Sequence, residues 1–133
     1  ACKSLGYRPI TIVARNEAKT LALLGHASER SAILPWGAPL PACDLLINAT
    51  PLGMAGHDAL PYDASALRDE GILFEMIYNP VTTPLLADAR ARGRRVVDGL
   101  QMLVAQAAPS FERFFGQTAP REHDGELQKL LTA

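Results

Sequence analysis

The sequence has little cysteine, few aromatic residues and no excess of charge of either sign. Its two cysteines, Cys2 and Cys43, are far apart. They offer neither a disulfide framework nor the closely spaced thiols of a zinc site, and isolated cysteines are typical of a reducing cytoplasm. The histidines also lack the spacing of metal ligands: His26, His57 and His123. We therefore expect a cytoplasmic protein without a metal site.

The charges are nearly balanced, with 13 basic and 14 acidic residues among 133. Such a balance gives no electrostatic case for binding nucleic acid or an anionic membrane surface. No apolar run approaches the roughly 20 residues of a membrane span, and no signal-peptide pattern is present. The length suits one domain with a modest core. We expect a small-molecule ligand rather than a nucleic acid or a membrane.

Strand-like and helix-like segments alternate along the chain. Apolar or β-branched runs predict strands at 10–14, 31–34, 44–48, 71–77 and 95–98. Helices are predicted at 1–5, 17–24, 84–93, 99–115 and 122–131, with a helical turn at 64–67. Trp36 lies in a proline-rich loop and is expected to cover the edge of the core. Apolar strands separated by helices indicate the α/β class, a parallel sheet with helices on both faces.

Unusual residues follow three of the predicted strands. In doubly wound α/β sheets, ligands bind beyond the carboxyl ends of the strands. Those ends carry the runs Ala14-Arg15-Asn16, Asn48-Ala49-Thr50-Pro51 and Tyr78-Asn79-Pro80. Because the carboxyl ends of parallel strands lie at one edge of a sheet, we expect these runs to line the same cleft.

Arg15 follows the strand at 10–14 directly. After the second strand of a Rossmann unit, an acidic residue bonds the ribose 2′-hydroxyl of NAD, whereas an arginine accommodates the 2′-phosphate of NADP. A guanidinium offers phosphate a fork of donors that a carboxylate would repel. Lys19, one helical turn later, adds a second cation, and Ala14 and Asn16 flank the site. The alternative is a pair of solvated surface cations.

The long predicted helix at 99–115 has two faces. At about 100° per residue, one apolar stripe collects Leu100, Leu103, Val104, Ala107 and Phe111. A second cluster points well away from that stripe and consists of Gly99, Met102 and Gln106. A helix buried on one face needs no such second cluster, so it fits the wall of a cleft. The alternative is a flank that packs against a neighbouring element.

Three runs together resemble the nicotinamide-domain half of the shikimate dehydrogenase family. They are NATPLGM at 48–54, YNPVTTPLL at 78–86 and DGLQMLVAQ at 98–106. The resemblance extends over about residues 1–118. It implies a Rossmann-like NADP-binding domain. It also implies NADPH-dependent reduction of 3-dehydroshikimate to shikimate by hydride transfer, a step of the chorismate pathway to aromatic amino acids.

The resemblance also implies roles for single residues. It places the nicotinamide beside Ala49, Thr50, Met76, Gly99 and Met102, and it assigns substrate contacts to Tyr78 and Gln106. Glu75 stands where the family more often carries aspartate, and a buried carboxylate there is expected to accept hydrogen bonds from loop amides. By composition alone, 48–54 would be an ordinary proline-stiffened turn. Tyr78 alone would be a core tyrosine with an outward hydroxyl.

Parts of the family pattern have no counterpart in this sequence. The family's catalytic lysine and aspartate belong to a preceding substrate domain, so no catalytic residue is assigned here. The first strand and its Gly-x-Gly-Gly turn, which hold the pyrophosphate at a helix N-terminus, are also missing. We therefore expect 1–133 to be a partial Rossmann domain without its first strand, with 119–133 as a C-terminal surface helix. We expect it to be a piece of a longer protein.

Two alternatives stay open. The parent enzyme could act on quinate or an aminated shikimate analogue, because Tyr78 and Gln106 do not distinguish these substrates. The chain could also be a non-catalytic binding module that keeps the fold.

Overall fold

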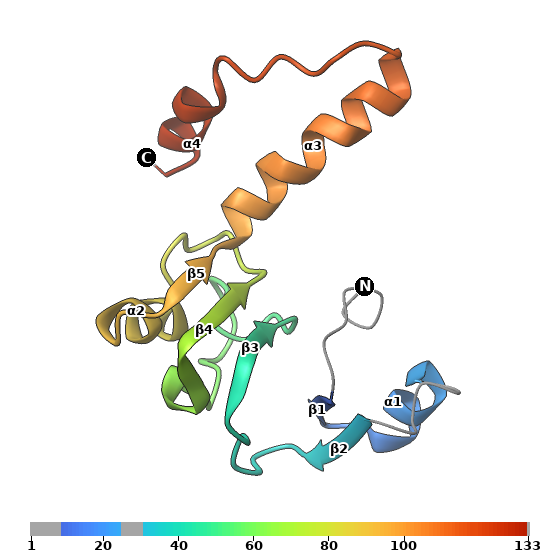
Figure 1. Ribbon diagram of the computed structural model, residues 1–133, viewed down its shortest axis with the longest axis vertical. Coiled ribbons are helices and arrows are strands. Elements are labelled where there is room, and N and C mark those ends of the chain that lie inside the picture. The colour runs from blue at the N-terminus through green and yellow to red at the C-terminus, as the bar shows by residue number, and fades with distance from the viewer. Residues whose placement is uncertain (1–8, 25–30, 133) are drawn as a thin grey trace. The chain divides into compact units, whose positions relative to one another are not determined.

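The computed structural model describes residues 9–24 and 31–132 (Figure 1). Contacts divide the chain into two compact units, one ending at Leu40 and one beginning at Pro41. Each unit carries its own parallel sheet. The helical turn predicted at 1–5 lies outside the described residues.

The first unit is a β–α–β element. Strand β1 (Ile10–Ala14) pairs in parallel with β2 (Ser31–Pro35), and helix α1 (Glu17–Leu24) follows β1. The helix begins at Asn16, whose side-chain oxygen accepts a hydrogen bond from the Lys19 amide at 2.9 Å. The Thr20 hydroxyl donates to the Asn16 carbonyl oxygen, also at 2.9 Å. The bond from the Lys19 amide satisfies one of the N–H groups that a helix start otherwise leaves unpaired, and the predicted helix start is confirmed.

The second unit contains a three-stranded parallel sheet in the order β3-β4-β5. Its strands are β3 (Cys43–Asn48), β4 (Leu67–Glu75) and β5 (Arg95–Val97). Strand β4 begins four residues before the predicted start, because its polar first part pairs with β3 through an Arg68–Asp44 ion pair at 2.8 Å. A polar segment lacks the apolar pattern from which strands are predicted, so the start of β4 was not predicted. The strand ends at Glu75, where the chain turns into the candidate site.

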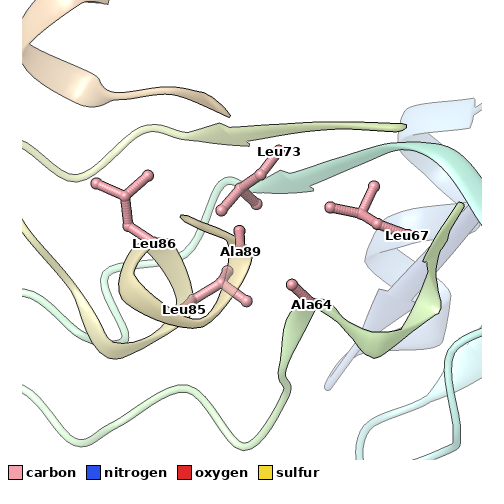
Figure 2. Packing of buried hydrophobic residues seen from close by; sticks show 6 residues of the cluster. All are labelled: Ala64, Leu67, Leu73, Leu85, Leu86 and Ala89. Atoms are coloured by element: carbon pink, nitrogen blue, oxygen red, sulfur yellow. The ribbon is translucent and has the colours of Figure 1, made fainter. Parts of the chain in front are cut away.

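One face of this sheet holds the core. Helix α2 (Pro84–Ala91) and the 3₁₀ turn η2 (Ala64–Ala66) pack there. The core cluster consists of Ala64, Leu67, Leu73, Leu85, Leu86 and Ala89 (Figure 2). Burying each leucine stabilises the fold by about 1.5–3 kcal/mol. The helix starts as predicted, with Thr83 as its N-cap and Pro84 in its first turn.

The opposite face of the sheet is less covered. Ile47, Phe74 and Val97 are neighbours in one cross-strand row. Ile47 and Val97 are each 37% exposed, although both belong to apolar strands. Strands of a parallel sheet are usually buried on both faces. The described residues of this unit therefore leave part of an apolar face without a covering layer.

The strand arrangement confirms the α/β class with a parallel sheet and helices. In a Rossmann sheet ordered 3-2-1-4-5-6, strands 2 and 3 lie on one side of strand 1 and the later strands on the other. The described strands form two separate sheets, β1-β2 and β3-β4-β5.

Two helices complete the second unit, α3 (Gly99–Phe115) and α4 (Asp124–Thr132). The buried side chains of α3 include Leu100, Val104 and Ala108. The predicted Ala107 is exposed instead. The reason is that the buried side chains are spaced four residues apart. This spacing is slightly more than one helical turn, so the buried row winds around the helix instead of running parallel to its axis. None of the helices in the described residues is long and apolar enough to cross a membrane.

Candidate functional site

In the first unit, the candidate site lies where β1 and β2 end. The register places Ala14 opposite Pro35, so Arg15 and Trp36 follow at adjacent positions. The central guanidinium carbon of Arg15 lies 6.0 Å from the centroid of the Trp36 ring. From the sequence, Trp36 was expected to cover the edge of the core, and its contact with Arg15 was not predicted. The feature that could have indicated this contact is that Trp36 directly follows β2, the strand that pairs with β1.

Arg15 and Lys19 are both exposed. Among the ion pairs of the described residues, none involves either side chain. Their positive charges are therefore open to an anion, which fits the 2′-phosphate predicted there. The predicted residues Ala14, Arg15, Asn16 and Lys19 do lie together at the junction of β1 and α1. The side-chain oxygen of Asn16 also caps the helix.

In the second unit, Asn48 organises the loop after β3. The side chain is buried, and its oxygen accepts hydrogen bonds from the Thr50 amide at 3.0 Å and the Thr50 hydroxyl at 2.8 Å. Its amide nitrogen donates to the Leu52 carbonyl at 3.2 Å. The hydroxyl proton of Thr50 is therefore used within the loop, whereas Ala49 is exposed. Sequence reasoning placed Thr50 in the site but missed Asn48 as the residue that shapes it.

The loop after β3 is tied to the loop after β4. Gly53 has a φ of +97°, a left-handed conformation that favours glycine. Its amide donates to the Asp58 carbonyl at 2.8 Å, which closes the loop. The Ala55 amide donates to the Asn79 carbonyl at 3.0 Å, next to Tyr78. The structure thus brings together two of the three predicted strand ends.

Glu75 holds the loop that carries Tyr78. Its carboxylate is fully buried and accepts hydrogen bonds from the Ile77 amide at 3.3 Å and the Thr83 hydroxyl at 2.9 Å. The bond from the Ile77 amide confirms the predicted role of Glu75. Thr83 in turn accepts from the Leu86 amide at 3.2 Å at the start of α2. One buried carboxylate therefore fixes the loop on both sides of Tyr78.

Between these anchors, two predicted site residues face outward. Tyr78 is 52% exposed and Met76 is 39% exposed. Within the described part of the chain, no hydrogen bond involves the Tyr78 hydroxyl. An outward hydroxyl on a fixed loop suits contact with a polar ligand.

The start of α3 lies against the same loop. A Cβ atom built at Gly99 would be 2.7 Å from the Met76 carbonyl oxygen and closer still to the backbone of Ile77. Only glycine permits this approach. Asp98 fixes the helix start, because it accepts from the Gln101 amide at 2.9 Å while the Gln101 side chain accepts from the Asp98 amide. Gly99 therefore lies beside Met76.

Met102 and Gln106 continue along α3 on the face of Gly99. Met102 is half-buried and Gln106 is exposed. At a rise of about 1.5 Å per residue, Gln106 stands roughly 10 Å along the helix from Gly99. No hydrogen bond of the described residues joins the Gln106 side chain to Tyr78. The structure thus groups Met76, Tyr78 and Gly99 closely and places Gln106 farther out.

The chain is similar to known dehydrogenases. Residues 99–123 match the family model of the shikimate 5′-dehydrogenase C-terminal domain. Over 93% of its length the chain is 43% identical to a shikimate dehydrogenase (NADP(+)) from Sphingopyxis alaskensis, of which it covers 45%.

Solved structures show the same likeness. The chain matches 48% of shikimate 5-dehydrogenase from Thermus thermophilus in complex with NADP(H) and shikimate, with 97% of the chain covered, 27% identity and a TM-score of 0.75. It also matches 48% of quinate dehydrogenase from Corynebacterium glutamicum in complex with NAD, with 96% covered, 26% identity and a TM-score of 0.74. The chain spans about half the length of these proteins. Over most of its length the chain is thus similar to about half of each of these dehydrogenases, and residues 99–123 match the C-terminal domain of the shikimate 5′-dehydrogenase family.

Proposed function

We propose that this chain is the NADP-binding part of an oxidoreductase that reduces 3-dehydroshikimate to shikimate with NADPH, in the chorismate pathway. The observation that carries the proposal is the 43% identity, over 93% of the chain, to a shikimate dehydrogenase (NADP(+)). The structural likeness to a shikimate 5-dehydrogenase solved with NADP(H) and shikimate supports it. A role in this biosynthetic pathway also agrees with the cytoplasmic location that the isolated cysteines suggest.

The cofactor proposal rests on the end of β1. Arg15 and Lys19 are exposed cations, with no ion-pair partner among the described residues. They would hold the 2′-phosphate that distinguishes NADP from NAD. The bound NADPH supplies the hydride. The chain would hold its nicotinamide with the small and apolar residues Ala49, Thr50, Met76, Gly99 and Met102.

Substrate binding is assigned to Tyr78 and Gln106. Both side chains are exposed and can donate a hydrogen bond to a hydroxyl or carbonyl oxygen. Glu75 keeps the Tyr78 loop in place. Precise placement matters for hydride transfer, because the reacting atoms must approach closely in a defined orientation. No residue of this chain is proposed to exchange a proton with the substrate.

The proton-transferring groups and the pyrophosphate loop are proposed to belong to an upstream segment of the same protein. Three observations support such a partner. The chain covers 45% of its relative, the described strands form two sheets, and Ile47 and Val97 stay partly exposed on an apolar face. That upstream segment would supply the first strand of the Rossmann sheet and its helix. Residues 1–133 would then be the remainder of one domain, and its C-terminal helix is α4, which begins at Asp124 rather than at residue 119.

A quinate dehydrogenase is the second candidate, because one structural relative is a quinate dehydrogenase in complex with NAD. A non-catalytic binding module is the third. Steady-state assays of the protein with its upstream segment distinguish these three candidate functions. The proposal predicts NADPH oxidation with 3-dehydroshikimate at a higher kcat/KM than with 3-dehydroquinate. The reverse order would favour quinate, and NADPH binding without turnover of either compound would favour the module.

A further inference from the structure

Trp36 is the chain's one tryptophan, and a tight turn holds it at the end of β2. The Ala38 amide donates to the Pro35 carbonyl at 3.1 Å, and Gly37 has a φ of +88°. A positive φ at the third residue is what a type II turn requires, so glycine is suited to this place. Trp36 is the second residue of the turn and is half-buried. Its backbone position is therefore well defined.

The neighbour of this ring is Arg15. The parallel register ends at Ala14 and Pro35, and the guanidinium carbon lies 6.0 Å from the ring centroid. This distance is at the outer limit of a cation–π contact. The ring is partly covered, whereas Arg15 is exposed. A planar guanidinium can lie over an aromatic face and still direct its N–H groups outward at an anion.

We infer that Trp36 is a positioning residue for Arg15 and thereby helps determine the preference for NADPH over NADH. This inference rests on the proposed function. A free arginine side chain loses rotamer freedom when it binds phosphate, and a surface that already restricts it lowers this cost. NADH has no 2′-phosphate, so restricting Arg15 does not strengthen its binding. Trp36 therefore acts only on the cofactor that Arg15 contacts.

The test measures dissociation constants of NADPH and NADH for the protein with its upstream segment. Trp36→Leu keeps apolar bulk but removes the aromatic face, and Trp36→Phe keeps a smaller aromatic face. Trp36→Leu should weaken NADPH by about 2- to 5-fold and leave NADH unchanged, as expected for an exposed cation–π contact. Trp36→Phe should retain most of the NADPH affinity. Equal weakening of both cofactors by Trp36→Leu would overturn the inference and return Trp36 to a core-covering role.

A double-mutant cycle shows whether Trp36 acts through Arg15. In an Arg15→Gln background, Trp36→Leu should cause no further loss of NADPH affinity. An undiminished loss there would overturn the inference. Arg15→Gln alone also tests the underlying proposal. If it leaves the preference for NADPH intact, the NADP site itself is wrong; if it abolishes the preference while Trp36→Leu changes nothing, only the role of Trp36 is wrong.

Discussion

Single side chains around the candidate site have two kinds of task. Arg15 and Tyr78 are exposed and available to a ligand. Asn48 and Glu75 are buried at strand ends, and their oxygen atoms accept the hydrogen bonds that shape the two loops. The sequence predicted the exposed residues through their place after strands. It could not predict Asn48 as an organiser, because that role depends on how the loop folds back.

Arg15 gives the sharpest residue-scale prediction. Arg15→Asp should weaken NADPH binding by about 10- to 150-fold, the loss of a charge-assisted contact of about 1.5–3 kcal/mol. NADH binding should change little, because NADH lacks the 2′-phosphate. Titration of each cofactor into the complete protein measures both. Arg113→Asp makes the same charge change on an exposed helical residue and serves as control. Equal losses for both cofactors would refute the phosphate role of Arg15.

The substrate residues should behave differently from Arg15. Tyr78→Phe and Gln106→Ala should each lower kcat/KM for 3-dehydroshikimate by roughly 2- to 12-fold, the usual range for one neutral hydrogen bond. The dissociation constant of NADPH should stay nearly the same. Gln117→Ala, at an exposed position after α3, is the control for Gln106→Ala. An effect confined to NADPH binding would move these residues to the nicotinamide subsite.

At the scale of elements, caps and turns were the most informative part of the sequence. The structure confirms the helix start predicted at residue 84, where Thr83 is the N-cap of α2 and Pro84 lies in its first turn. The start of β4 could not be predicted, since its polar residues pair with β3 only in the folded chain. The contact of Trp36 with Arg15 likewise depends on the register between β1 and β2. Both features depend on pairing between segments that are distant in the sequence, and local sequence patterns do not reveal such pairing.

The close contact of α3 with the Tyr78 loop predicts a strong effect of a single methyl group. Gly99→Ala would place Cβ against the carbonyl groups of Met76 and Ile77. We expect destabilisation of about 1–3 kcal/mol, the usual cost of overpacking. Gly125→Ala is a matched control in α4, where nothing lies within 4 Å of the new atom. Thermal unfolding compares the two, and equal midpoints would contradict the contact.

Asp88 links η2 to α2 and predicts a pH dependence. It accepts hydrogen bonds from the Ala64 amide and from Arg92, both at 2.9 Å. The Arg92 hydrogen bond, followed by that from Ala64, lowers the pKa of Asp88 below its ordinary value of 3.8. A lowered pKa stabilises the fold above pH 3.8, and this stability is lost as pH falls through the folded-state pKa.

The corresponding variant is Asp88→Asn. It should be less stable than the original protein at neutral pH, and the difference should shrink as the pH falls below 3.8. Urea unfolding at a series of pH values measures this difference. A difference that stays constant across the series would show that the charge of Asp88 contributes nothing.

For the whole molecule, the α/β class and the place of the site at strand ends follow from the sequence. In the proposed function, the chain would provide the 2′-phosphate end, one wall for the nicotinamide and two substrate contacts. Without the pyrophosphate loop and the proton-transferring groups, these parts should not form a catalyst.

The most direct measurement is therefore shikimate-dependent reduction of NADP⁺ by the purified 133-residue chain and by the protein with its upstream segment. The longer protein should turn over shikimate. The 133-residue chain should show no turnover and should bind NADPH weakly or not at all. Robust turnover by the 133-residue chain alone would contradict the proposal that an upstream segment supplies the proton-transferring groups, and it would contradict the residue roles proposed for this site.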